Sequence, residues 1–115
     1  MNKIKLVVNN VSKRNEKEKF FIKKELQSIL NLYAKMVSNG SWKDYSFTSD
    51  TKEVSFDVYQ RASEKPVLRI LKNLKPRYFN EKYLIKDKNG AILKKSENLN
   101  QLISKTSWNK LKLVK

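Results

Sequence analysis

The stretch FIKKELQSILNLYAKMVSNG, residues 21–40, decides how the rest of the chain can fold. Its apolar side chains recur at intervals of three and four residues, which gathers them on one face of an α-helix. This apolar face consists of Ile22, Leu26, Ile29, Leu30, Tyr33, Met36 and Val37. We therefore expect a helix over about residues 22–39, with Phe21 packing back against it as a hydrophobic staple. Asn39-Gly40 then supplies a left-handed helix stop.

Beyond Gly40 the apolar period becomes two, which is the period of a strand with one buried face. Strand-like segments occur at residues 42–47, 54–59, 67–74, 83–86 and 91–94. Asn89-Gly90 separates the last two segments and predicts a hairpin with a type I′ turn. The apolar spacing within Leu99–Ile103 predicts a shorter closing helix with Ser96 as its N-cap.

This order of a helix, about five strands and a helix predicts an α+β fold. The strands form a small antiparallel meander sheet, and the N-terminal amphipathic helix and the shorter C-terminal helix cover one of its faces. The chain has 115 residues, enough for one small domain, which we assign to residues 20–115. Residues 1–19 are mostly polar and basic, so we expect a flexible basic tail in which residues 3–8 alternate like a short strand. Residues 111–114 are a further strand candidate.

The charge of the chain is strongly positive, with 26 Lys plus Arg against 11 Asp plus Glu and a formal net charge of +15. Of the basic residues 22 are Lys, and Asn is also abundant, which is the composition that A/T-rich codons produce. Such codon drift should also raise Glu, so a selected preference for anionic partners stays open beside it.

The missing residue types exclude several classes of function. The chain has no Cys and no His, which removes disulfides, thiolate nucleophiles, imidazole bases and most transition-metal sites. Its two glycines cannot form a phosphate-cradling loop. We therefore expect a protein that is not an enzyme and has no cofactor or metal. Neither a signal peptide nor an apolar run long enough to span a membrane is visible, so we expect it in the cytoplasm.

A polar cluster is predicted where the first two strands meet. If they pair antiparallel around a turn at Asp50, Asp44 lies near Tyr59 or Arg61, and Trp42 stacks over the Arg61 guanidinium. The cluster consists of Trp42, Asp44, Tyr45, Arg61, Ser63 and Glu64. It is either a structural ion pair that fixes the strand register or a recognition site for a peptide or a nucleic-acid element. The alternative to nucleic-acid binding as the function of the protein is a protein–protein interaction module that uses this cluster.

The outward face of the predicted sheet combines basic and aromatic side chains. Cations neutralise phosphates and exposed rings stack on unpaired bases, so this combination favours single-stranded nucleic acid, RNA in particular. The candidate nucleic-acid-binding residues are Tyr59, Arg69, Lys72, Lys75, Arg77, Tyr78, Lys86, Lys94 and Lys95. A solvated Lys-rich face and a surface for an acidic protein are the alternatives.

Four segments of the chain resemble one known family. They are FIKKELQSILNLYAKMVSNGSWKDY (residues 21–45), VSFDVYQRASEKPVLRI (54–70), YLIKDKNGAILKK (83–95) and LNQLI (99–103). The chain is similar in these segments to an uncharacterised family of short alphaproteobacterial proteins, domain of unknown function 2794. Ile22 and Lys95-Ser96 depart from the family pattern, which has a polar capping residue and an Arg-Gly pair at these positions. The resemblance implies a fold and a bacterial origin and implies no activity.

Overall fold

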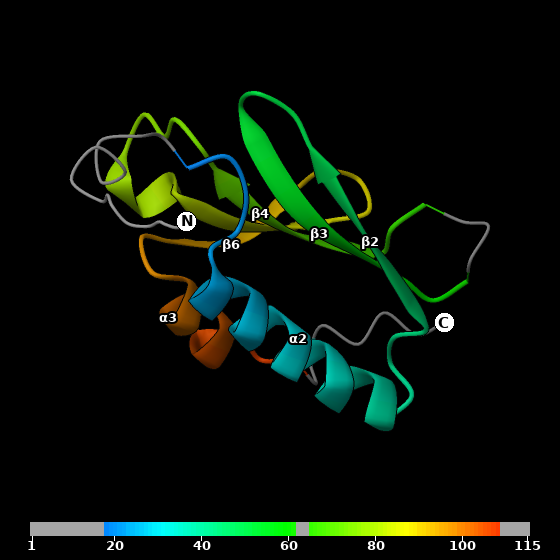
Figure 1. Cartoon of the computed structure of the whole chain (residues 1–115). Coiled ribbons are helices and arrows are strands. Elements are labelled where there is room, and N and C mark those ends of the chain that lie inside the picture. The colour runs from blue at the N-terminus through cyan, green and yellow to red at the C-terminus, as the bar shows by residue number, and fades with distance from the viewer. Residues whose placement is uncertain (1–17, 62–64, 109–115) are drawn as a thin grey trace, which may run out of the picture.

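The computed structural model describes residues 18–61 and 65–108 (Figure 1). Most of the predicted tail and the strand candidates at residues 3–8 and 111–114 lie outside these ranges. The described elements are α2 (Lys23–Ser38), β2 (Asp44–Ser49), β3 (Glu53–Tyr59), β4 (Leu68–Asn73), the 3-10 helix η1 (Phe79–Glu81), β5 (Tyr83–Asp87), β6 (Ile92–Ser96) and α3 (Leu99–Lys105). All neighbouring strands pair antiparallel in the order β2-β3-β4-β5-β6, and both helices lie on the same side of the sheet (Figure 1). The predicted α+β meander is confirmed.

Glu25 and Gly40 define the two ends of α2. Ile22 occupies the N-cap position but has no side-chain acceptor; instead Glu25 reaches back and accepts a hydrogen bond from the Ile22 backbone N–H at 2.8 Å. Gly40 follows the helix with φ +84°, a left-handed conformation that favours glycine, so the predicted stop is confirmed.

The buried face of α2 is rotated relative to the prediction. Its buried residues are Glu25, Ile29, Leu32 and Met36, whereas the predicted core residues Ile22, Leu30 and Val37 are exposed. The prediction was wrong at these three positions because the helix turns a carboxylate, Glu25, toward a cation in the sheet. The apolar side chains that flank this face are therefore displaced toward solvent.

The hydrophobic core fills the space between the helices and one face of the sheet. Its sheet side is formed by alternate residues of the three central strands, in accord with the strand period of two. These residues are Val54, Phe56, Val58, Leu68, Ile70, Tyr83 and Ile85. Ile29 and Leu32 of α2 and Leu102 of α3 pack against them from the helical side.

The strand register agrees with the prediction at β2 and β3, where Asp44 lies opposite Tyr59. The β5–β6 hairpin is also confirmed, but its turn differs. The Asp87 N–H donates to the Ala91 carbonyl, so three residues rather than two connect the strands, and Gly90 adopts φ +87°. The N-cap of α3 is Asn98, which accepts from the Gln101 N–H at 2.9 Å, and not Ser96.

Neither of the two α-helices in the described ranges has the length and apolar character that crossing a bilayer requires.

Candidate functional site

The face of the sheet opposite the helices, called the outer face below, carries a hydrogen-bonded network around Asp57. Asp57 is only 3% exposed, and its carboxylate accepts from Thr48 and Ser55, each at 2.7 Å, and from Arg69 Nε at 3.0 Å. Arg69 also donates to the Ser55 hydroxyl at 2.9 Å. The network joins β2, β3 and β4, because Asp57 lies opposite Ser46 and Arg69 in the register. A buried carboxylate so fully bonded is a device that fixes strand pairing.

The predicted cluster around Trp42 is divided between the core and the surface. Trp42 is buried, with ring contacts to Tyr33 and Trp108, so its indole belongs to the core and not to an exposed recognition surface. Asp44 is exposed and accepts from the Tyr45 N–H at 2.8 Å. Tyr45 packs edge-on against Tyr33 of α2. Arg61 is exposed, and Ser63 and Glu64 lie outside the described residues.

Lys72 does not belong to the outer face. It is 1% exposed and points to the helical side of the sheet, where its ammonium lies 2.8 Å from Glu25 Oε1 and 2.6 Å from Glu18 Oε1. It also donates to the Phe20 carbonyl at 3.1 Å. The prediction that Lys72 contacts nucleic acid was wrong, because the strand period of two places it on the same face as Ile70.

Tyr83 completes this buried group, since its hydroxyl donates to Glu25 Oε2. Burial, together with the hydrogen bond to Glu25, raises the pKa of the Tyr83 hydroxyl far above its usual range. The hydrogen bond from Lys72 holds the pKa of the Glu18 carboxyl below its usual range. The group has donors and acceptors matched internally and serves to attach α2 to β4 and β5.

Other candidate residues are distributed over several surfaces. Lys94 lies opposite Ile85, a core residue, so it is on the helical side of edge strand β6, and its predicted outward direction was wrong. Lys95 lies opposite Leu84 and faces outward. Lys86 and Tyr59 are also on the outer face, both half-buried, and the Tyr59 hydroxyl is hydrogen-bonded to Ser46 at 3.0 Å.

The connection between β4 and β5 brings the remaining candidates together. Its η1 turn exposes Phe79 to 84% and Tyr78 to 59%. Lys75, Arg77 and Lys82 flank these rings in the chain, and Lys82 Nζ lies 5.5 Å from the Tyr83 ring centroid. Lys95 of β6 lies 3.8 Å from Glu81 of η1. We call this surface the η1 patch; it consists of Lys75, Arg77, Tyr78, Phe79, Lys82 and Lys95.

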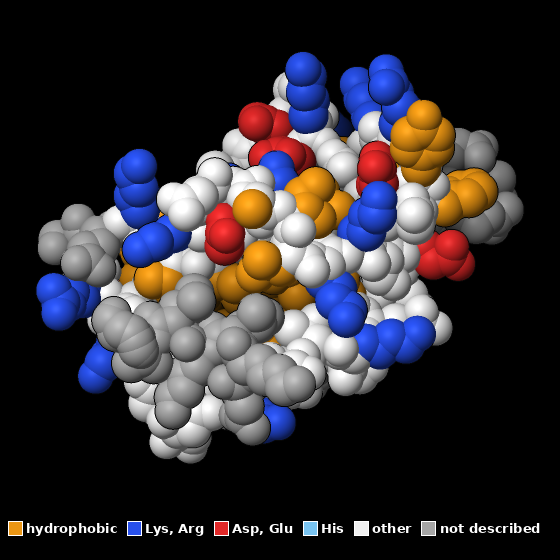
Figure 2. All heavy atoms as spheres, turned by 180° about the vertical axis from the view of Figure 1, so that it is seen from behind, with side chains coloured by type: hydrophobic (Ala, Val, Ile, Leu, Met, Phe, Trp, Pro, Cys, Tyr) orange, Lys and Arg blue, Asp and Glu red, His pale blue; other side chains and the backbone are white. Residues whose placement is uncertain are grey.

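The basic residues as a whole are not confined to one face. Figure 2 shows Lys and Arg side chains at the top, left, bottom and lower right of this face, with Asp and Glu side chains among them in the upper half. The surface of the two helices carries basic side chains without acidic ones, because Glu25 is the one acidic residue in α2 and α3 and it is buried. The net charge therefore does not by itself identify a site. Tyr78 and Phe79 of the η1 patch are more exposed than any other ring among the described residues, which distinguishes that surface.

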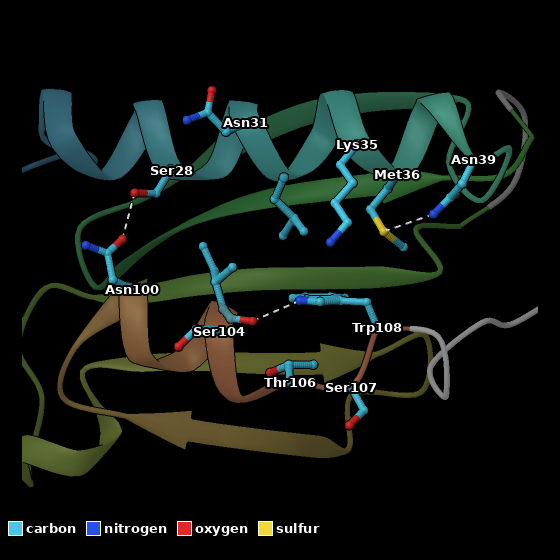
Figure 3. Close-up of a pocket in the computed structure, with 12 residues that line it drawn as sticks. Ser28, Asn31, Lys35, Met36, Asn39, Asn100, Ser104, Thr106, Ser107 and Trp108 are labelled. Carbon is cyan, nitrogen blue, oxygen red and sulfur yellow. Dashed lines mark hydrogen bonds between the residues drawn. The ribbon is translucent and has the colours of Figure 1, made fainter.

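A groove of about 730 Å³ lies between α2 and the segment from α3 to Trp108 (Figure 3). Its apolar lining is Leu32, Met36, Ile103 and Trp108, and its polar rim includes several amide side chains. Figure 3 shows Lys35 and Met36 pointing from α2 toward Trp108, while Ser28 and Asn100 close one end with a 2.7 Å hydrogen bond. The sequence alone did not indicate this groove, because it arises where α3 ends and Trp108 folds back to donate to the Ile103 carbonyl at 2.9 Å.

Comparison with family models gives one match. The model described as a protein of unknown function (DUF2794) matches residues 19–103. The chain belongs to this family. The matched range includes α2, the whole sheet, the Asp57 network and the η1 patch, so these features lie within the family's domain. Comparisons with curated proteins and with solved structures find no match.

Proposed function

We propose that this family member is a non-enzymatic cytoplasmic protein that binds single-stranded RNA, and that the η1 patch is its contact surface. The observation that carries the proposal is the exposure of Tyr78 and Phe79, which lie in the chain between Arg77 and Lys82. Neighbouring exposed rings offer apolar surface that a partner can bury. Unpaired bases are suitable partners, because each has a ring face and is linked to a phosphate that a nearby cation neutralises.

The position of the patch in the fold supports this assignment. The rings stand on a connection held to the sheet by the Asn73 side chain, which donates to the Glu81 carbonyl at 2.9 Å, and by the Asn73 N–H, which donates to the Lys82 carbonyl at 2.7 Å. A contact surface on an anchored turn loses less conformational entropy on binding than one on a free loop. Glu81 is the one acidic residue within the connection, and Lys95 neutralises it.

The proposal is tested by fluorescence anisotropy with a labelled single-stranded RNA of about 12 nucleotides, a length suited to one small domain. We expect Tyr78→Ser with Phe79→Ser to weaken binding roughly tenfold or more, since each stacked base contributes about 1–3 kcal/mol. Ile92→Ser is the control, because this substitution also removes an exposed apolar side chain, but one that has no aromatic ring. Equal affinities of wild type and the double variant would overturn the proposal.

The groove of Figure 3 favours a second candidate function, the binding of an acidic protein segment. Among the described residues that line it, Lys35 is the charged one, and the rest offer an apolar floor and amide groups. A labelled amphipathic peptide with leucines on one face and glutamates on the other is a direct probe. Peptide binding that is lost in the Lys35→Glu variant would support this candidate. Absence of peptide binding to the wild type at low salt would exclude it.

A further inference from the structure

The outer face of the sheet contains a hollow of about 510 Å³ beside the Asp57 network. Two connections contribute to its lining: the one between β3 and β4 supplies Lys65, and the turn between β5 and β6 supplies Lys88. Tyr59 and Arg69 line the hollow from the strands. This volume lies within the range of sites for small molecules, which is roughly 300–1,000 Å³.

The guanidinium of Arg69 has one edge engaged and one edge open. Its Nε and Nη2 donate to Asp57 Oδ1 and to the Ser55 hydroxyl at 3.0 and 2.9 Å, so the edge that these two nitrogens form is turned toward the Asp57 network. The other edge, formed by Nη1 and the second N–H of Nη2, has no hydrogen-bond partner among the residues that the structure describes. The side chain is 31% exposed. A planar fork of this kind donates to two oxygens of one phosphate or carboxylate.

Lys65 and Lys88 add two further cations to the lining. Both are exposed, and neither forms an ion pair within the described ranges. Lys88 stands on a turn that Asp87 holds, because Asp87 Oδ1 accepts hydrogen bonds from two backbone N–H groups of the turn, each at 2.9 Å. Asp57, the other carboxylate in the lining, is 3% exposed and receives three hydrogen bonds. The carboxylates are therefore engaged within the fold, whereas the cations retain unused donors.

We propose that this hollow is a binding site for a phosphate monoester of a flat organic group, of which a nucleoside monophosphate is the simplest example. A carboxylate has two oxygens, and the open edge of Arg69 would occupy both, leaving Lys65 and Lys88 unused. A phosphate monoester has three terminal oxygens and about 1.5–2 negative charges at neutral pH, so it matches the arginine and the lysines together. The organic group fills the space that a phosphate alone would leave empty, where Tyr59 and Pro66 contribute apolar ring surface to the lining.

The hollow and the η1 patch are separate sites. Arg69 lies four residues before Asn73, the residue of β4 that anchors the η1 connection, so about 13 Å of strand separates the two. Binding of a phosphate monoester at the hollow therefore does not depend on the RNA contact proposed above, and each site can be altered while the other stays intact.

An NMR titration of the full chain with uridine monophosphate tests the site, with uridine as the probe that lacks the phosphate. We expect the backbone amide signals of Arg69 and of residues 87–90 to shift with the monophosphate and to stay in place with uridine. Equal shifts with uridine, or no shift at millimolar monophosphate, would overturn the proposal. A trinucleotide with a phosphate at its 5′ end is the third probe. If it binds more tightly than the monophosphate, the ligand is the phosphorylated end of a strand, and otherwise it is a free nucleotide; both results retain the phosphate contact.

Matched charge variants localise the bound phosphate. Lys65→Gln with Lys88→Gln should weaken binding of uridine monophosphate at least about tenfold, because the phosphate loses two of its three cations. Lys75→Gln with Arg77→Gln removes the same charge from the η1 patch and should leave the affinity unchanged. All four positions are exposed, and circular dichroism verifies that both variants fold. Equal losses of affinity in the two variants would attribute binding to the net charge and overturn the proposal.

Arg69→Lys tests the fork separately from the charge. The substitution keeps a cation beside Asp57 but removes the open edge, so it should weaken binding of the monophosphate about tenfold in a chain that circular dichroism shows to be folded. An unchanged affinity in this variant would contradict the assignment of Arg69 to the phosphate.

Discussion

At the scale of single residues, the most informative side chain is one that sequence analysis assigned to the surface. Lys72 is buried against Glu25 and Glu18, and Tyr83 bonds the second oxygen of Glu25. A buried pair contributes little net stability relative to apolar packing, but removing one partner leaves an uncompensated charge in the interior. The group therefore specifies how α2 sits on the sheet.

Replacing one member of this pair should cost much more than replacing both. We expect Lys72→Met to lower the free energy of unfolding by about 3–5 kcal/mol, because Glu25 is then buried without its cation. The double variant Lys72→Met with Glu25→Leu should recover most of this loss. Urea denaturation measures both, with Lys75→Met as the exposed control. If the loss of unfolding free energy in the double variant equals the sum of the losses in Lys72→Met and Glu25→Leu, the pair is not coupled.

The raised pKa of the Tyr83 hydroxyl predicts that the folded protein loses stability at alkaline pH. Burial and the bond to Glu25 raise its pKa in the folded state, while tyrosine in the unfolded chain titrates near about 10. The stability from the neutral hydroxyl is therefore present below about pH 10 and is lost as the pH rises above it. We expect the unfolding free energy of wild type to fall more steeply than that of Tyr83→Phe between about pH 9.5 and 11.5. Parallel pH profiles would contradict this cause.

At the scale of elements, the Asp57 network holds three strands in register on the outer face. Its carboxylate receives hydrogen bonds from residues of β2, β3 and β4, and the Arg69 guanidinium is the cation among them. The sequence predicts that an Asp–Arg pair, Asp44 with Arg61, fixes the strand register. In the structure Asp57 and Arg69 form a pair of this kind, directly opposite each other on neighbouring strands.

Removal of the Arg69 side chain should therefore destabilise the sheet. We expect Arg69→Leu to lower the free energy of unfolding by about 2–4 kcal/mol, since the buried Asp57 loses its counterion. Lys86→Leu is the control, because Lys86 of β5 lies directly opposite Arg69 of β4, on the same face of the sheet. Thermal denaturation compares the two. A loss for Arg69→Leu no larger than for Lys86→Leu would exclude a structural role for the pair.

Local sequence patterns predicted most of the elements. The period of α2, the Gly40 stop, the Asn89-Gly90 hairpin and the pairing of Asp44 with Tyr59 depend on neighbouring residues, and all are observed. The rotation of α2 depends on a contact between Glu25 and Lys72, which are 47 positions apart in the chain. The groove likewise requires α2 to meet Trp108 across the fold. Such distant contacts leave no periodic signal in the sequence.

At the scale of the whole molecule, the net charge of +15 makes binding to any polyanion depend on salt. Counterion release makes RNA binding weaker as the salt concentration rises.

The central claim, that the η1 patch binds RNA, is tested most directly by the salt dependence of a matched pair of charge variants. Lys75→Gln, Arg77→Gln and Lys82→Gln together remove three charges from the patch, and Lys23→Gln, Lys24→Gln and Lys35→Gln remove three from α2. With about 0.7 counterions released per neutralised phosphate, the patch variant should lower the log–log salt slope by about two, and the α2 variant should leave it unchanged. The same change of slope in both variants would contradict the claim, because the net charge and not the patch would then account for binding.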